Sequence, residues 1–193
     1  MPQPMRSRGT RRTDVANATA MGGSRSALEV ALRREFFARV GGLAIRYNVT
    51  PDQVLSHCRR HRPSSPLGAS RMVGHLEDLT LVAGCLAHVG LAWSDLVEAN
   101  ELSLIRGLRD RVSEPEAVMI VRRWLRALRL NSLGREDDPA PSLGRYPGVK
   151  PLRHWLAERL TGELTRTSIL PPGRRLRLTG QQFGPSMSSS VGS

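Results

Sequence analysis

The chain has 193 residues, of which 39% are hydrophobic, so it can form one ordinary domain with a modest core but not a large multidomain protein. Its formal net charge is +12, and Lys150 is the only lysine among its 29 basic residues. This charge favours polyanionic partners, nucleic acid ahead of acidic proteins and anionic membranes, because clustered cations release counterions from phosphates. Codon bias in a GC-rich genome explains the arginine content equally well.

The cysteine content and the hydropathy indicate the cellular compartment that we expect for this protein. Two cysteines, Cys58 and Cys85, are too few for a disulfide framework. No apolar run approaches the ~20 residues that span a bilayer, and no signal-peptide core follows the start. The arginine-rich opening resembles an organellar transit peptide in composition but lacks its amphipathic stripe. We therefore expect a cytoplasmic protein with free thiols and no membrane contact.

The first 70 residues are predicted to form a disordered basic tail and a helical extension. Residues 1–24 lack apolar periodicity and are rich in Gly, Ser, Thr and Arg, which is typical of disorder. Residues 25–70 carry two helix starts: a capping box at Ser26, and Thr50-Pro-Asp-Gln, which combines a cap with a proline in the first turn. Gly41 and Gly42 are expected to end or bend the first helix, and "RPSSP" to stop the second.

Residues 71–170 show helical periodicity throughout and no β alternation. A helix over 77–87 is followed by a break at Val89-Gly90 and a longer helix from Leu91 to Val112. A capping box at Ser113 begins a helix that contains "MIVRRWLRAL", residues 119–128. After a loop of about 20 residues, longer than compact domains usually contain, the last helix starts near Pro151. Residues 171–193 form a second tail predicted to be disordered, and the predicted fold class is all-α.

Neither a metal site nor an enzyme active site is predicted. His57-Cys58-x-x-His61, with His75 further on, lacks the second ligand pair of a zinc site, so we favour a solvated basic helix face. The chain has no Gly-rich phosphate cradle, zincin helix, nucleophile elbow or catalytic cysteine signature. We expect a protein without cofactor or catalytic activity.

Two basic surfaces are candidates for binding. The helix over 119–128 presents basic residues beside its apolar stripe, and the candidate partner-binding residues there are Met119, Arg122, Arg123, Arg126 and Arg129. The loop and last helix carry the candidate DNA-binding residues Arg145, Tyr146, Lys150, Arg153, His154, Trp155 and Arg159. Cations around an aromatic ring suit single-stranded nucleic acid, in which a base can stack on the ring. A solvated face, with arginine stems covering apolar surface, is the alternative.

The order of these segments resembles a known family. "HLEDLTLVAGCLAHVGLAWSDLVEANELSLIRGL" followed by the capped helix at Ser113 resembles region 2 of bacterial RNA polymerase sigma factors of the extracytoplasmic-function type. "LGRYPGVKPLRHWL" is similar to the promoter-melting segment of that region, and the match covers roughly residues 71–166.

The resemblance implies a compact helical bundle that binds the RNA polymerase core and captures the melted non-template strand of the −10 promoter element. It places Tyr146, Lys150, Arg153 and Arg159 on the DNA side and Trp155 either in the core or at a stacking position. The helix over 119–128 corresponds to the one that docks on the polymerase clamp. An anti-sigma protein is a further candidate partner.

Three departures from the family pattern bear on function. Arg122 and Arg123 stand where the family prefers glutamine and acid, and Gly162 is expected to break the last helix. The residues after Arg166 are too few and too rich in Pro, Gly and Ser to form the helix-turn-helix that reads the −35 element. The alternative function is a sigma-fold interaction module or regulator that no longer directs initiation.

Overall fold

A computed structural model describes residues 12–61, 65–132 and 142–167 of the chain. These residues form helices and connecting turns, and none of them lies in a β-strand, which confirms the all-α prediction. The elements in chain order are α1 (Arg12–Arg46), α2 (Pro51–Arg60), α3 (Pro66–Gly74), α4 (Leu76–Leu86), α5 (Gly90–Leu108), α6 (Glu114–Ser132), the 3-10 turn η1 (Leu143–Arg145) and α7 (Leu152–Arg166). The tail over 171–193 lies outside the described residues.

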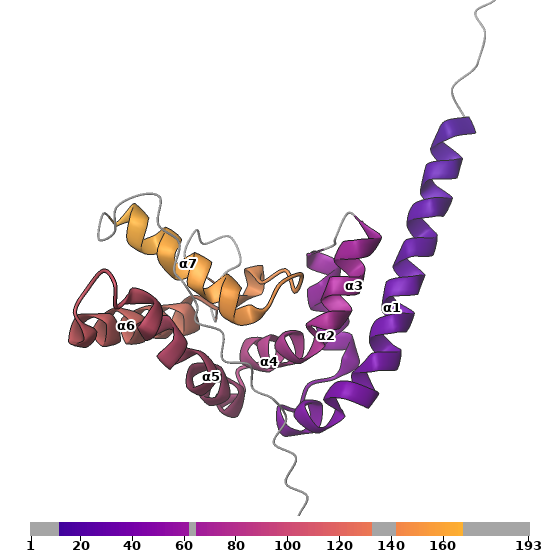
Figure 1. Ribbon diagram of the computed structural model, residues 1–193. Coiled ribbons are helices and arrows are strands. Elements are labelled where there is room, and N and C mark those ends of the chain that lie inside the picture. Colours follow the sequence, from indigo (N-terminus) through magenta and orange to yellow (C-terminus); the bar gives the residue numbers. More distant parts are fainter. Residues whose placement is uncertain (1–11, 62–64, 133–141, 168–193) are drawn as a thin grey trace, which may run out of the picture.

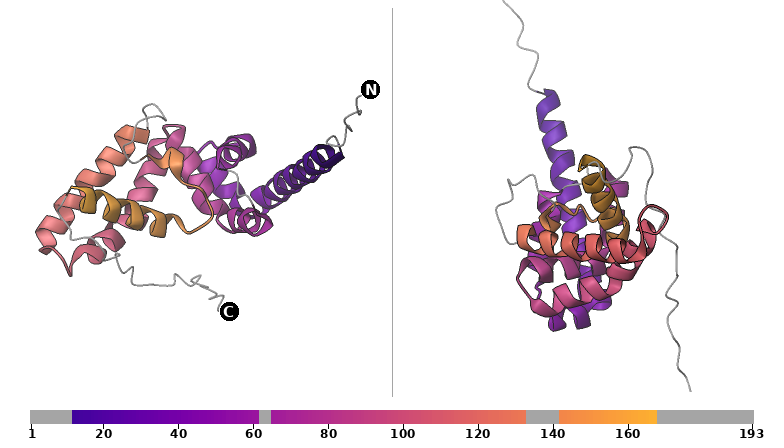
Figure 2. Two further views of the ribbon diagram at one scale, coloured as in Figure 1. Left: turned by 90° about the horizontal axis from the view of Figure 1, so that it is seen from above. Right: turned by 90° about the vertical axis from the view of Figure 1, so that its left-hand side faces the viewer.

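Helix α1 is longer than the sequence predicts. It begins at Arg12 rather than at Ser26, so helix occupies part of the range predicted to be disordered. It also continues through Gly41 and Gly42, and a Cβ atom added at either glycine would have no neighbouring group within 4 Å. Its core-facing residues recur every fourth position, and they are Leu32, Phe36, Val40 and Ala44. The N-terminal part of α1 projects from the rest of the molecule (Figures 1 and 2).

Helix α2 has the capping box that its sequence predicts. The Gln53 amide N–H donates to Thr50 Oγ1 at 3.3 Å, and the Thr50 amide N–H donates to Gln53 Oε1 at 2.7 Å. Helix α3 was not predicted, because the proline-serine run before it was interpreted only as a stop. That run is also a start: the Ser65 hydroxyl accepts from the Gly68 amide at 3.2 Å, and a proline occupies the first turn.

Helices α1 to α3 pack onto the remainder of the bundle through α4 (Figure 1). The guanidinium of Arg39 on α1 donates to the carbonyls of Val73 and Gly74 at 2.9 and 3.3 Å, and so caps the C-terminus of α3. Tyr47, just after α1, donates its hydroxyl to Asp95 Oδ2 of α5 at 2.6 Å, and burial followed by this hydrogen bond raises the pKa of Tyr47 to about 12. The first contact therefore holds α1 to α3, and the second joins the N-terminal helices to α5.

Close contact between helices centres on Gly84 of α4. A Cβ atom at this position would lie 3.0 Å from the Cβ atoms of both Ala92 on α5 and Tyr47. Such contacts are tighter than ordinary packing, so a side chain at this position would push these elements apart. The turn from α4 to α5 passes through His88 with a φ of 63°, which confirms the break predicted near Val89.

One continuous cluster of buried residues includes side chains from all seven α-helices. The expected boundary between a helical extension and a following domain, at residues 70 and 71, falls inside α3. Helix α7 runs to Arg166 through Gly162, so the predicted break at this glycine is wrong. Gly162 is exposed and has open space around it, and its neighbours on α7 supply the buried face that keeps the helix intact.

Candidate nucleic-acid interface

The segment between α6 and α7 is described from residue 142 onward, and it begins as the short turn η1. Ser142 caps η1, because its hydroxyl accepts from the Gly144 amide at 3.2 Å. Leu143 is fully buried, and its amide donates to the Ser132 hydroxyl at the end of α6 at 2.8 Å. The backbone entering the segment is therefore fixed by α6 and by the core.

Two histidines, His57 in the last turn of α2 and His61 at its C-cap, contact the same turn. His57 Nε2 lies 2.7 Å from the carbonyl oxygen of Tyr146, and His61 Nε2 forms a hydrogen bond with the carbonyl oxygen of Gly144. A carbonyl oxygen only accepts, so each ring must carry hydrogen on Nε2. His57 is buried, and this burial lowers its pKa from 6.5 to about 4, so its ring is neutral at physiological pH.

Tyr146 is a core residue in the structure and not a stacking platform. Its side chain is 0% exposed, and its hydroxyl donates to the carbonyl oxygen of Lys150 at 2.6 Å. The ring packs edge to face against Trp155 with centroids 5.6 Å apart. Burial, reinforced by Asp78, raises the pKa of the Tyr146 hydroxyl. The sequence-based assignment of this ring to DNA contact is therefore wrong, because the segment folds it inward.

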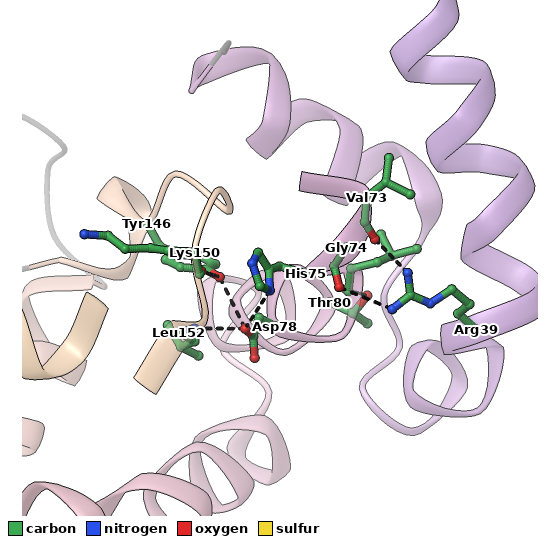
Figure 3. A network of polar contacts seen from close by, with 10 residues as sticks. Arg39, Val73, Gly74, His75, Asp78, Thr80, Tyr146, Lys150 and Leu152 are labelled. Atoms are coloured by element: carbon green, nitrogen blue, oxygen red, sulfur yellow. Dashed lines mark hydrogen bonds and ion pairs between the residues drawn. The ribbon is translucent and has the colours of Figure 1, made fainter. Parts of the chain in front are cut away.

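Asp78 of α4 joins the segment to α7 (Figure 3). Its Oδ2 accepts from the Leu152 amide, at the first residue of α7, at 2.9 Å and lies 3.4 Å from the Tyr146 hydroxyl. His75 Nδ1 is 3.9 Å from the same oxygen. Burial raises the pKa of Asp78, although the bond from Leu152 and the charge of His75 oppose that rise. The carboxylate takes the place of an N-cap for α7, whose own flanking residue is Pro151.

Gly148 allows the segment to turn back toward α7. Its φ is +71°, in the left-handed region that favours glycine, and a Cβ atom here would lie 2.7 Å from Leu79 Cδ2. Backbone conformation and packing therefore both require glycine at this position.

These contacts create an open pocket with a volume of about 470 Å³ beside the start of α7. It is lined by Arg145, Pro147, Lys150, Trp155, Glu158 and Arg159, and we call it the cationic pocket. Lys150 is ion-paired with Glu158, and the guanidinium of Arg159 lies 5.3 Å from the centroid of the Trp155 ring. Three cationic groups thus share the pocket with one carboxylate.

The predicted DNA-binding residues are divided by the structure into three groups. Arg145, Lys150, Trp155 and Arg159 come together around the cationic pocket, although Trp155 is only 3% exposed and presents little of its ring. Arg153 and His154 are exposed on the first turn of α7 but do not line the pocket. Tyr146 supports the pocket from within the core.

The second predicted surface, on α6, has the expected pattern of buried and exposed residues. Val121, Trp124, Leu125 and Leu128 are buried, whereas Arg122, Arg123, Arg126 and Arg129 are exposed, which confirms the apolar stripe. Met119 is 64% exposed at one end of this arginine face.

Two of the four arginines have partners within the molecule. Arg122 Nε lies 2.6 Å from Glu101 Oε1, and Arg129 lies over the Trp93 ring at 5.8 Å from its centroid. Arg123 and Arg126 form no ion pair with any residue of the described ranges, so they are the more available cations.

Residues that support the site include several that sequence reasoning did not assign to it. His57 and Cys58 are buried, so the interpretation of their helix as a solvated basic face is wrong. Burial also raises the pKa of the Cys58 and Cys85 thiols to about 12. The i, i+4 spacing of His57 and His61 was a signal that they share a helix face, but not of what they contact. The sequence around Asp78 gave no indication that its side chain contacts the segment before α7.

Comparison of the chain with protein-family models, with curated proteins and with solved structures finds no match in any of the three. Within the part of the chain that the structure describes, no group of three or more His, Cys, Asp or Glu side chains is placed to hold a metal ion. In the same ranges, no helix combines the length and apolar character needed to cross a bilayer.

Proposed function

We propose that the chain is a sigma-factor-like transcription initiation protein, which binds single-stranded DNA of a promoter −10 element in the cationic pocket and the RNA polymerase core through α6. The observation that carries this proposal is the convergence of Arg145, Lys150 and Arg159 on one open pocket of about 470 Å³. The order of the sigma-like segments and the net charge of +12 support it.

The lining of the cationic pocket suits a nucleotide that has left its stack. Guanidinium and ammonium groups pair with phosphate oxygens, and a guanidinium plane offers a base a surface to stack on. Arg159 already lies against Trp155, so its plane is supported before any ligand arrives. With Tyr146 in the core, stacking in this proposal takes place on arginine rather than on a tyrosine ring.

A recess of this kind favours single strands over duplex. Sequence readout of duplex DNA commonly uses a helix or ribbon that projects into a groove, whereas a pocket receives one unstacked nucleotide at a time. Phosphates then follow the neighbouring cations, and the first turn of α7 offers the exposed guanidinium of Arg153 and the exposed imidazole of His154 as a hydrogen-bond donor.

Fluorescence anisotropy with a labelled −10-like single strand and the matching duplex tests the DNA role. We expect Lys150→Ala and Arg159→Ala each to weaken single-strand binding roughly tenfold and to reduce the slope of log affinity against log salt by about 0.7. Arg34→Ala removes an exposed arginine on α1 and is the matched control. Equal affinity of all four proteins, or equal binding of duplex, contradicts the proposal.

A second candidate function rests on the α6 arginine face. Arg123 and Arg126 lie between two exposed apolar side chains, Met119 at 64% and Leu130 at 63% exposed, along one stripe of the helix. This pattern is complementary to an acidic amphipathic helix, and it supports an interaction module that acts without promoter DNA.

Pull-down of core polymerase by the wild type and by Arg123→Glu/Arg126→Glu separates the two functions. Polymerase capture that the charge reversal abolishes supports docking through α6. Capture that survives the reversal shows that α6 is not the docking surface. Single-strand binding without any polymerase capture contradicts the polymerase-binding part of the first proposal and leaves its DNA-binding part standing.

A further inference from the structure

His57 of α2 and His61, the C-cap of α2, bond to carbonyl groups on either side of Arg145. His57 Nε2 contacts the carbonyl oxygen of Tyr146 at 2.7 Å, and His61 Nε2 contacts that of Gly144. His57 lies in the last turn of α2, and His61, four residues later, is the C-cap of that helix. Their partners are 89 and 83 residues away in sequence. The N-terminal part of the molecule thus forms direct hydrogen bonds with the segment that lines the cationic pocket.

The other contacts of this segment act elsewhere along its backbone. Ser132 holds the Leu143 amide, and Asp78 holds the Leu152 amide at the start of α7. The amides of Arg145 and Tyr146 bond within η1, to the carbonyls of Ser142 and Leu143 at 3.1 and 3.0 Å. The carbonyls that flank Arg145 bond to the histidines, so these two bonds add to the contacts that fix its backbone.

We infer that His57 and His61 are positioning residues for nucleic-acid binding: they fix the backbone on both sides of Arg145 and so direct its guanidinium toward the cationic pocket. The effect on binding rests on the proposed function, whereas the effect on the segment itself does not. A positioning role also gives the N-terminal helices a function in the site, beyond packing against α4.

His61 is the better position for the test, because it is only partly buried whereas His57 lies in the core. Its matched variants are His61→Leu, which removes the donor, and His61→Gln, whose amide nitrogen can donate from nearly the same place as Nε2. Binding is measured by anisotropy with a −10-like single strand. Local order is measured by amide hydrogen exchange at Arg145 and Tyr146.

We expect His61→Leu to speed exchange of these two amides and to weaken single-strand binding, each about fivefold to tenfold, as loss of one hydrogen bond predicts. His61→Gln should stay within about twofold of the wild type in both. Because His61 is inferred to act through Arg145, His61→Leu/Arg145→Ala should bind no more weakly than Arg145→Ala alone. His57→Gln should resemble His61→Gln.

The possible outcomes separate this inference from the proposed function. Additive losses in the double variant, or unchanged exchange at Arg145 and Tyr146 in His61→Leu, overturn the positioning role. Faster exchange with unchanged affinity overturns it as well. A wild type that binds no single strand defeats the proposed function, and the exchange measurement then still decides whether the histidines hold the segment.

Discussion

His57 is an ionisable residue in the core, and its two ring nitrogens differ in their hydrogen bonding. Nε2 bonds to the Tyr146 carbonyl, whereas Nδ1 is buried and has no hydrogen-bond partner among the described residues. Protonation would place a charge and an unpaired donor in the core, close to His61 and Arg60, whose charges also lower its pKa. The folded state therefore binds this proton more weakly than the unfolded state does.

The pKa of about 4 predicts how stability depends on pH. The contribution of neutral His57 is fully present above the unfolded pKa of about 6.5 and is lost as pH falls toward 4. Between pH 7 and pH 5 we expect the free energy of unfolding to fall by about 2 kcal/mol more in the wild type than in His57→Gln. Urea unfolding of both proteins at the two pH values measures this difference, and equal losses contradict it.

Substitution by alanine should have opposite effects on the stability of the fold at the two glycines Gly148 and Gly162. Gly148→Ala should destabilise the fold by about 1–3 kcal/mol, because the residue has positive φ and its Cβ would meet Leu79. Gly162→Ala should stabilise it by about 0.5–1 kcal/mol, because the site is an exposed helix position with open space. Chemical denaturation measures both changes in the free energy of unfolding, and changes of the same sign contradict this expectation.

At the scale of elements, helix α7 depends on a side chain from a different helix. Its first amide, at Leu152, bonds to Asp78 of α4 instead of to a residue beside it in the chain. The same carboxylate lies beside the Tyr146 hydroxyl, so one group fixes both the helix and the segment before it. The relative position of α4 and α7 is therefore set by polar contacts as well as by apolar packing.

We expect Asp78→Ala to lower the free energy of unfolding by about 1–3 kcal/mol, the cost of leaving a buried amide without an acceptor. Asp78→Asn should cost less, because its side-chain oxygen can still accept from Leu152. The exposed neighbour Glu77 gives a control, with a change below about 0.5 kcal/mol expected for Glu77→Ala. If Asp78→Ala and Glu77→Ala prove equally mild, Asp78 does not cap α7.

Sequence reasoning succeeded for elements whose apolar stripe faces the core. The stripe of α6 and the start of α7 near Pro151 were predicted, since buried residues recur with the helical period. The segment 65–66 was misinterpreted, because a serine followed by proline both ends one helix and begins the next. Tyr146 was placed on the DNA side, because a sequence shows an aromatic ring among cations but not which way the chain turns it.

Across the whole molecule, the buried residues form one cluster that crosses from the N-terminal helices to α7. Tyr47 and Arg46 bond to Asp95 on α5 at 2.6 and 2.8 Å, and His57 bonds to the segment before α7. These contacts join the N-terminal helices to elements far along the chain, so α1 to α3 should not unfold independently of α4 to α7.

The three tryptophans make this expectation measurable, because Trp93, Trp124 and Trp155 all lie on α5, α6 and α7. Tryptophan fluorescence therefore reports on the C-terminal helices, whereas far-ultraviolet circular dichroism reports on all of them. We expect the two signals to give the same midpoint in urea. A separate earlier transition in circular dichroism alone would show that α1 to α3 unfold as an independent unit.

The burial of both cysteines has a practical consequence for work on the cationic pocket. A thiol with a pKa of about 12 holds almost no thiolate at neutral pH, and thiolate is the form that reacts with maleimides. A cysteine introduced at an exposed position, such as Ser94 on α5, should therefore take up a dye while Cys58 and Cys85 stay unmodified. Site-specific labelling becomes accessible without replacing either native cysteine.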